Sequence, residues 1–518
     1  MRIERRSTVM LTLLAVGILI SLRVYEPWRP TQFSVTDFCD FLPLLIGHHT
    51  FGGRLSAFVE YYSRQGRFNV VPYTYLILEW TAFGWNAAAW QVSRFVEMTG
   101  IVVLVYVLLR RLTGSRPGAG AGAALFFVAS CASSAWIRLT LSEAQAMWPL
   151  LGAALLATTY QSTNRWRSSG LGIALLMIVL VLSKEVLIAL VPFVVLLAWT
   201  YNAPGQFMRP VMSRRNRWIM YATLTTTVLA SIPIALIALR ASGSSYAGGY
   251  GHGSATLTRV LGLFAALAYP TYATYPPHID FALPANFAFL LVIAAGWGLP
   301  PADLKHRATR RRLAACLVGI LFVGVATYLP WPFFLSYYGL PYLLAPAALL
   351  AFAVKFIEQD RPRFRWLAYT ACLVIVVQAA VYASYESRRD LAAREVNGVL
   401  IDLISQRTGQ DTVLVATRSV SPDAPWGGTA QILHRFSAAV YPNRLVPPGF
   451  DVTCATARAV EAARALHRNM LVSFADQCGT VNQPSSVARA VFSYFYWPAP
   501  SIRQDSVRAD VIIPAAMP

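Results

Sequence analysis

The sequence predicts an α-helical polytopic membrane protein with about eleven transmembrane helices and a small C-terminal α/β domain outside the cytoplasm. Of its 518 residues, 56% are hydrophobic and only 13% are charged, whereas a soluble domain carries roughly 25% charged residues. Apolar runs of about 20 residues, the length that crosses a bilayer, recur through most of the chain. Arginines cluster between these runs, as the positive-inside rule expects. The net charge of +20 therefore does not indicate a nucleic-acid partner.

The expected spans follow the apolar runs in order along the chain. They are residues 8–23, 87–109, 118–136, 144–160, 169–184, 185–202, 218–240, 281–299, 313–329, 339–356 and 366–384. The first span follows MRIERR without a small-x-small cleavage site, so we expect an uncleaved signal anchor. Residues 257–277 are apolar but rich in proline and tyrosine, which favours an interfacial or re-entrant helix.

The loops predict the orientation of the spans. With the N-terminus in the cytoplasm, every short basic cluster falls on the cytoplasmic side. These clusters lie within 110–116, 165–167, 209–217, 305–312 and 355–365. An odd number of spans then places the C-terminus outside. We expect an integral protein of a bacterial inner membrane, with a periplasmic C-terminal region.

Two regions stand outside the apolar spans. The transmembrane domain, 1–387, contains a long first outer loop, 24–86, whose short apolar stretches predict amphipathic helices lying on the membrane. Residues 388–518 alternate between helical patterns and strand-like runs such as MLVSFAD, which indicates a small α/β domain. If this domain is extracytoplasmic, Cys454 and Cys478 are candidates for a disulfide.

Two acids follow the first expected span. Asp37 and Asp40 lie in FSVTDFCDFLPLL, and their spacing puts both carboxylates on one face of a helix. At an outer membrane surface, such a carboxylate suits a general base that takes a proton from an incoming nucleophile. The structural alternative is that Asp37 caps a surface helix.

Other charges lie close to membrane depth, where they are costly and often functional. Lys184 and Glu185 interrupt an apolar run, and Lys184 could hold an anionic phosphate as a point charge or lie in a solvated turn. Glu143 either orients a ligand or stabilises a helix N-terminus. Arg138 could contact a phosphate or merely flank the next span. Arg67 could pair with a phosphate or snorkel from an interfacial helix.

Five segments together resemble the GT-C superfamily of membrane glycosyltransferases, which use polyprenyl-phosphate sugars. The resemblance covers roughly residues 1–350 and lies in the order and spacing of the segments. They are the acids Asp37 and Asp40 after span one, RFNVVPYTYLILEWTAFGWNAAAWQVSRF at 67–95, Glu143 before the fourth span, LSKEVLIALVPFVVLL, and LPWPFFLSYYGLPYLLAPAALL. Within the superfamily, the chain looks similar to the protein mannosyltransferase and aminoarabinose transferase types.

The resemblance implies an inverting transfer of one sugar from an isoprenoid phosphate to a hydroxyl acceptor, which is a glycan, a lipid or a protein. It implies that Asp37 or Asp40 is the base and that Lys184, with Arg67 or Arg138, binds the donor phosphate. Glu143 and Glu185 would orient the acceptor or a divalent cation, Mg²⁺ or Mn²⁺. The chain departs from the family pattern because its acids are DxxD and because no His-Pro precedes Glu143. The resemblance therefore leaves the acceptor and the use of metal open.

Three other classes of protein fit a polytopic chain. A transporter or flippase of a lipid-linked sugar predicts inverted repeats and charges near the midplane, and the sequence shows neither. A polymerase or ligase of lipid-linked glycan predicts a late, arginine-rich outer loop, whereas the acids here come early. An inactive scaffold that presents the C-terminal domain is separated from an enzyme only by assay.

Overall fold

The computed structural model describes residues 41–129, 142–207, 213–240, 256–269, 279–298, 304–330, 336–381, 470–473 and 509–512, together with 132, 135, 136 and 383. The chain divides into two compact units. One comprises Met1–Ala57, Glu79–Val92 and Tyr385–Pro518; the other, called the bundle unit below, comprises Phe58–Leu78 and Ser93–Ser384. The expected first span at 8–23 lies outside the described residues.

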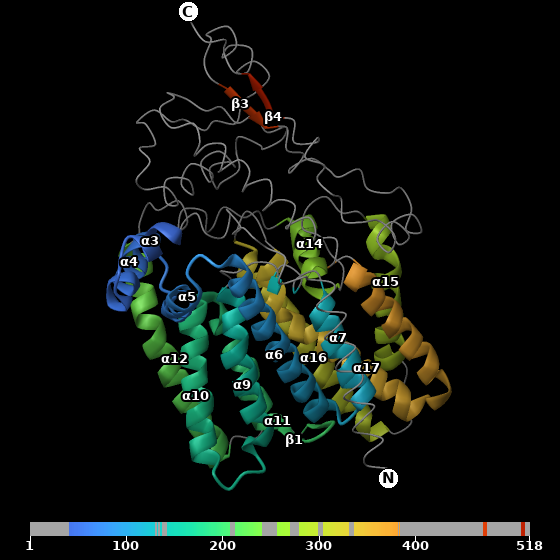
Figure 1. The fold of residues 1–518 in the computed structure, drawn as a ribbon. Helices are drawn as coiled ribbons and strands as arrows, with labels where there is room; N and C mark the ends of the chain where they lie inside the picture. Colours follow the sequence, from blue (N-terminus) through green and yellow to red (C-terminus); the bar gives the residue numbers. More distant parts are fainter. Residues whose placement is uncertain are drawn as a thin grey trace, which may run out of the picture. The chain divides into compact units, whose positions relative to one another are not determined.

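The described chain is almost entirely helical (Figure 1). The elements are α3 (Leu42–Ile46), α4 (Phe51–Arg64), α5 (Val70–Phe83), α6 (Ala87–Thr113), α7 (Arg116–Val128), α9 (Ser142–Tyr160), α10 (Trp166–Ser183), η1 (Glu185–Leu190), α11 (Val191–Thr200), β1 (Tyr201–Ala203), β2 (Gln206–Phe207), α12 (Arg214–Arg240), α14 (Leu257–Ala268), α15 (Ile279–Ile293), η2 (Ala294–Gly298), α16 (Leu304–Tyr328), η3 (Ser336–Leu343), α17 (Leu344–Asp360), η4 (Pro362–Phe364), β3 (Met470–Ser473) and β4 (Ala509–Ile512).

Within the described residues, six helices are long and apolar enough to cross a membrane. They are Ala87–Thr113, Trp166–Ser183, Arg214–Ile237, Ala308–Tyr328, Tyr337–Asp360 and Pro362–Val381. Each overlaps an expected span, so the helical polytopic class is confirmed. The total of eleven spans and their orientation stay predictions.

Several boundaries differ from those expected. Within the span expected at 118–136, helix α7 ends at Val128, where Ala129 adopts an extended backbone, and residues 132, 135 and 136 are helical again. The span expected at 185–202 begins as the 3-10 helix η1 and becomes α-helical only at Val191, where a proline occupies the first turn. The expected helix at 257–277 is the shorter α14, whose N-cap Thr256 accepts a hydrogen bond from the Arg259 backbone N–H.

Helix α17 forms the core of the bundle unit, since 89% of its candidate span is buried. It packs on α7, α16 and η2. The contact with α7 is close because α7 presents glycines. A Cβ atom on Gly118 would lie 2.4 Å from the Ala351 carbonyl oxygen, and one on Gly122 would lie 2.5 Å from that of Ala347. Small residues four apart on both helices thus let the two backbones approach.

Polar contacts fix the end of the bundle unit at which α9 turns into α10. The Arg215 guanidinium donates to the Gln161 carbonyl at 2.6 Å, and the Tyr160 hydroxyl donates to the Arg215 carbonyl at 2.7 Å. The Gln161 amide donates to the Ala198 carbonyl at 2.7 Å, which adds the end of α11. The β1–β2 hairpin lies at this same lower end in Figure 1.

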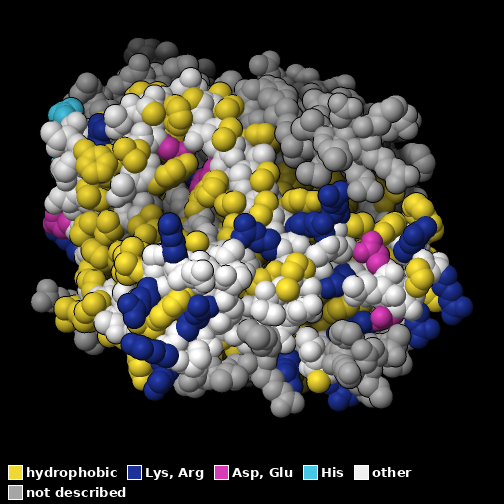
Figure 2. Space-filling view, turned by 90° about the horizontal axis from the view of Figure 1, so that it is seen from below, with side chains coloured by type: hydrophobic (Ala, Val, Ile, Leu, Met, Phe, Trp, Pro, Cys, Tyr) yellow, Lys and Arg dark blue, Asp and Glu magenta, His cyan; other side chains and the backbone are white. Residues whose placement is uncertain are grey.

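The face seen from below carries many lysine and arginine side chains (Figure 2). Helix ends and turns at this end of the bundle unit contain Arg111, Arg165, Arg215 and Arg310. We call this the basic end. It gathers arginines from loops that the sequence analysis placed on one side, as the predicted orientation requires.

Two described strands lie far along the chain, in the other unit. Strand β3, Met470–Ser473, pairs antiparallel with β4, Ala509–Ile512. The strand predicted at MLVSFAD is therefore confirmed, whereas β4 was not predicted. The α/β domain at 388–518 and its position outside the cytoplasm stay predictions.

Candidate active site

Glu143 and Lys184 meet at the end of the bundle unit opposite the basic end. Glu143 lies in the first turn of α9, and α9 leads down to the turn at Gln161. Helix α10 returns from that turn alongside α9 (Figure 1). It ends at Ser183, so Lys184 comes back to the level of Glu143. The backbone of Lys184 is extended and separates α10 from η1. The helical hairpin thus brings together two charges that are 41 residues apart in sequence.

The two side chains form a buried ion pair. The Lys184 ammonium nitrogen lies 2.9 Å from Glu143 Oε1, and the two side chains are 6% and 1% exposed. The contact is electrostatic, without the directed geometry of a hydrogen bond to that oxygen. The Ser142 hydroxyl donates to the other carboxylate oxygen at 3.2 Å. Lys184 is therefore not in a solvated turn, which was the structural alternative for it.

An aromatic layer covers the lysine. The ammonium of Lys184 lies 5.2 Å from the ring centre of Tyr338 in η3, within cation–π range. That ring stacks on Tyr328, at the end of α16, with centroids 5.3 Å apart and an angle of 6° between the planes. The Tyr328 hydroxyl donates to the Tyr338 carbonyl at 3.2 Å, so a hydrogen bond as well as ring stacking joins the two tyrosines. These rings lower the local dielectric around the charge, which strengthens its attraction for an anion.

A second, looser ion pair lies beside the first in the chain. Arg67 Nε is 3.9 Å from Glu185 Oε1, and the side chains are 17% and 23% exposed. Arg67 lies in the connection from α4 to α5, where its backbone N–H donates to the Tyr62 carbonyl. Because Glu185 directly follows Lys184, the predicted residues Arg67, Glu143, Lys184 and Glu185 form one cluster, called here the charged cluster.

The other predicted site residues lie outside the described residues. They are Asp37, Asp40, Arg138, Cys454 and Cys478.

The described acids do not fit a divalent metal ion. No group of three His, Cys, Asp or Glu side chains converges among the described residues. Within the charged cluster each carboxylate faces a cation, Lys184 or Arg67, which is the wrong environment for a further positive charge.

Sequence reasoning missed one contact of the charged cluster and one buried ion pair of α6. The Tyr-rich segment LSYYGLPYLL was noticed, but the ring of Tyr338 over Lys184 was not predicted. The buried ion pair between Arg94 and Glu97 in α6 was also missed, although two opposite charges three residues apart in an apolar run signal such a pair.

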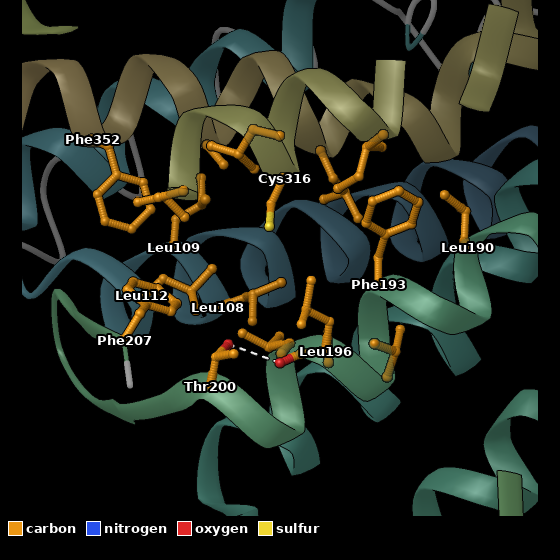
Figure 3. Close-up of a pocket in the computed structure, with 18 of the residues that line it drawn as sticks. Leu108, Leu109, Leu112, Leu190, Phe193, Leu196, Thr200, Phe207, Cys316 and Phe352 are labelled. Atoms are coloured by element: carbon orange, nitrogen blue, oxygen red, sulfur yellow. Dashed lines mark hydrogen bonds between the residues drawn. The ribbon is translucent and has the colours of Figure 1, made fainter. Parts of the chain in front are cut away.

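A large apolar cavity runs through the bundle unit from the level of η1 toward the basic end (Figure 3). Its volume is about 450 Å³. Phe193 and Leu190 lie at one end, and Phe352 and Phe207 lie at the other. The hydroxyl of Thr200, a polar group in its wall, donates to the Leu196 carbonyl at 2.8 Å. The cavity is thus suited to a hydrocarbon chain.

Fold and site together define a class of protein: a helical membrane bundle that holds a buried, paired lysine near one end. The chain shares this fold with a solved structure, ArnT from Cupriavidus metallidurans in the apo state. The TM-score is 0.50 with 12% sequence identity, over 92% of this chain and 94% of that chain. The resemblance predicted from the sequence is thus confirmed at the level of the fold.

A second structure of ArnT from the same organism, bound to undecaprenyl phosphate, aligns with a TM-score of 0.49 and 12% identity. That alignment covers 90% of this chain and 93% of the other. No protein-family model and no curated protein matches the sequence.

Proposed function

We propose that this chain is an inverting glycosyltransferase that moves a sugar from a polyprenyl-phosphate donor to a hydroxyl acceptor at the outer face of a bacterial inner membrane. The buried ion pair of Lys184 with Glu143 carries the proposal, in a bundle with the ArnT fold. A full positive charge among membrane helices is costly and is usually functional. Lys184 lies at one end of these helices, which is the level at which a lipid phosphate would bind.

The reaction breaks the bond between the anomeric carbon and the phosphate oxygen and forms a bond to the acceptor oxygen. Asp37 or Asp40 takes the proton of the acceptor hydroxyl. The departing phosphate gains negative charge, and Lys184 stabilises it in a site from which aromatic rings exclude water. Stabilisation of developing charge by a preorganised group is commonly the largest catalytic contribution.

The acids of the charged cluster act on the cations rather than on a metal. Glu143 holds the Lys184 ammonium in place before the donor binds, and Glu185 does the same for Arg67 at longer range. Arg67 and Arg138 add further positive charge for the donor phosphate. In this account Glu143 is a positioning residue for Lys184. Glu143 and Glu185 orient the acceptor only indirectly, because they fix the cations that bind the donor phosphate.

The testing experiment measures transfer of radiolabelled sugar from polyprenyl-phosphate donors in membranes with matched expression. Wild type is compared with Asp37→Asn, Asp40→Asn and Lys184→Gln. The matched control is Arg310→Gln, which breaks the interhelical ion pair with Asp360 at the basic end.

We expect one aspartate variant and Lys184→Gln to lose transfer by about a hundredfold or more, and Arg310→Gln to retain it. Transfer that survives in both aspartate variants and in Lys184→Gln would reject the proposed mechanism. Absence of transfer by wild type from every donor would favour a transporter or an inactive scaffold.

A further inference from the structure

A buried lysine that the proposed reaction does not use follows, along α17, the end of the cavity that Phe352 lines (Figure 3). Leu344, Ala348 and Phe352 line the cavity from one face of α17, and Lys355 follows three residues later on that same face. Lys355 is only 8% exposed. Its ammonium lies against the β1–β2 turn, because a Cβ atom on Gly205 would fall 1.9 Å from the nitrogen. The same hairpin contributes Phe207 to the cavity wall.

The carboxylates near Lys355 on α17 already have other partners. Glu358 accepts hydrogen bonds from the hydroxyls of Ser115 and Tyr369. Asp360 pairs with Arg310. In the described part of the chain, no carboxylate forms an ion pair with Lys355. A buried ammonium without an anion is costly, so this position favours an anion from outside the chain.

The cavity reaches the surface at the same end. The exposed Arg312 of α16 lines it, as does Thr309. From Thr309 to Ile320, the lining residues of α16 span about 16 Å at a rise of about 1.5 Å per residue. That length is about half of the roughly 30 Å hydrocarbon core of a bilayer. The cavity is therefore about as deep as one leaflet, with the cation Arg312 in its wall and Lys355 one turn beyond its α17 lining.

We propose that this cavity holds one acyl chain of an anionic phospholipid from the leaflet at the basic end, with the lipid phosphate between Lys355 and Arg312. Apolar cavities of roughly 150 Å³ already take up benzene, so a dry space of about 450 Å³ accommodates a much longer hydrocarbon. The charge at the mouth selects an anionic headgroup. This lipid site is distinct from the charged cluster and does not depend on sugar transfer.

Photolabelling of the full-length chain in nanodiscs tests the proposal. The probe is phosphatidylglycerol with a diazirine at the end of one acyl chain, compared with the same probe on phosphatidylcholine. We expect the phosphatidylglycerol probe to label peptides of α11, α16 and α17, and the phosphatidylcholine probe to label them about fivefold less.

The variants separate the chain site from the headgroup site. Ala348→Phe fills the cavity and should abolish the labelling. Lys355→Gln should lower it about fivefold, and Arg312→Gln, on an exposed residue, gives the same readout if Lys355→Gln does not fold. Arg363→Gln, an exposed arginine on η4, is the control and should change nothing.

Equal labelling by both probes, or labelling that survives Ala348→Phe, would overturn the proposal. It would also be overturned if polyprenyl phosphate displaced the probe from wild type and not from Lys184→Gln, because the cavity would then belong to the sugar donor.

Discussion

Removal of either partner of the Lys184–Glu143 ion pair should destabilise the protein, and removal of both should restore its stability without restoring activity. The perturbation is a cycle of Lys184→Met, Glu143→Leu and the double variant. At 2.9 Å the Coulomb attraction is about 6 kcal/mol for an effective dielectric constant of about 20. Desolvation of the two buried charges offsets most of this attraction.

A single variant leaves one charge buried without its partner, which typically costs about 3–5 kcal/mol. The double variant replaces the pair with apolar groups of similar volume, a change that is often neutral. The free energy of unfolding should therefore fall in both single variants and return to within about 1 kcal/mol of wild type in the double variant, giving a coupling energy of at least about 5 kcal/mol.

The assay is denaturant unfolding of the purified protein in one detergent, followed by tryptophan fluorescence, with sugar transfer measured on the same samples. All three variants should lose transfer, because none of them offers the Lys184 ammonium paired with Glu143. Single variants as stable as wild type would refute the buried ion pair. A double variant that still transfers sugar would refute a role for Lys184 in catalysis.

Three further predictions follow from close contacts. Gly122→Ala should destabilise the protein by about 1–3 kcal/mol, because the new Cβ lies 2.5 Å from a carbonyl oxygen of α17; Gly120→Ala on the same helix meets nothing within 4 Å and should be neutral or slightly stabilising in the same unfolding assay. Gly205→Ala should lower the free energy of unfolding by about 1–2 kcal/mol, because its φ is +72°. The new Cβ should also displace the Lys355 ammonium and so lower the phosphatidylglycerol labelling. Gly84→Ala is the control: Gly84 also has a positive φ but no atom within 4 Å of a new Cβ, so the labelling should be unchanged. Tyr338→Leu should reduce transfer about threefold to thirtyfold by removing the ring over Lys184, whereas Tyr338→Phe should keep most of it, and equal loss in both would assign the effect to the hydroxyl.

The sequence identified the charged residues of the candidate site, but it did not predict which of them form an ion pair. Lys184 and Glu143 were identifiable because charges at the edge of apolar runs are costly. Their pairing depends on the length of α9 and α10 and on the extended backbone at Lys184, since these set the level to which the hairpin returns. Neither residue carries a local signal of the other, so burial and pairing appear only in the fold.

Helix ends and packing partners were harder to predict. The composition of 118–136 is apolar throughout, so hydropathy gave no reason for α7 to end at Val128. Tyr338 reaches Lys184 because η3 folds back against α9 and α16, and such tertiary contacts leave no periodicity in the sequence. The apolar cavity was equally hidden, because its wall is made of ordinary span residues from five or more separate elements.

The central claim is that Lys184 receives the phosphate of a polyprenyl donor. The most direct measurement is the affinity of the purified protein for polyprenyl phosphate and for the matching polyprenyl alcohol, by tryptophan quenching in nanodiscs, in wild type and in Lys184→Gln. The account predicts that wild type binds the phosphate at least about tenfold more tightly than the alcohol, the equivalent of roughly 1.4 kcal/mol, and that Lys184→Gln loses this preference. Equal affinity of wild type for both lipids, or a preference that survives in Lys184→Gln, would contradict it.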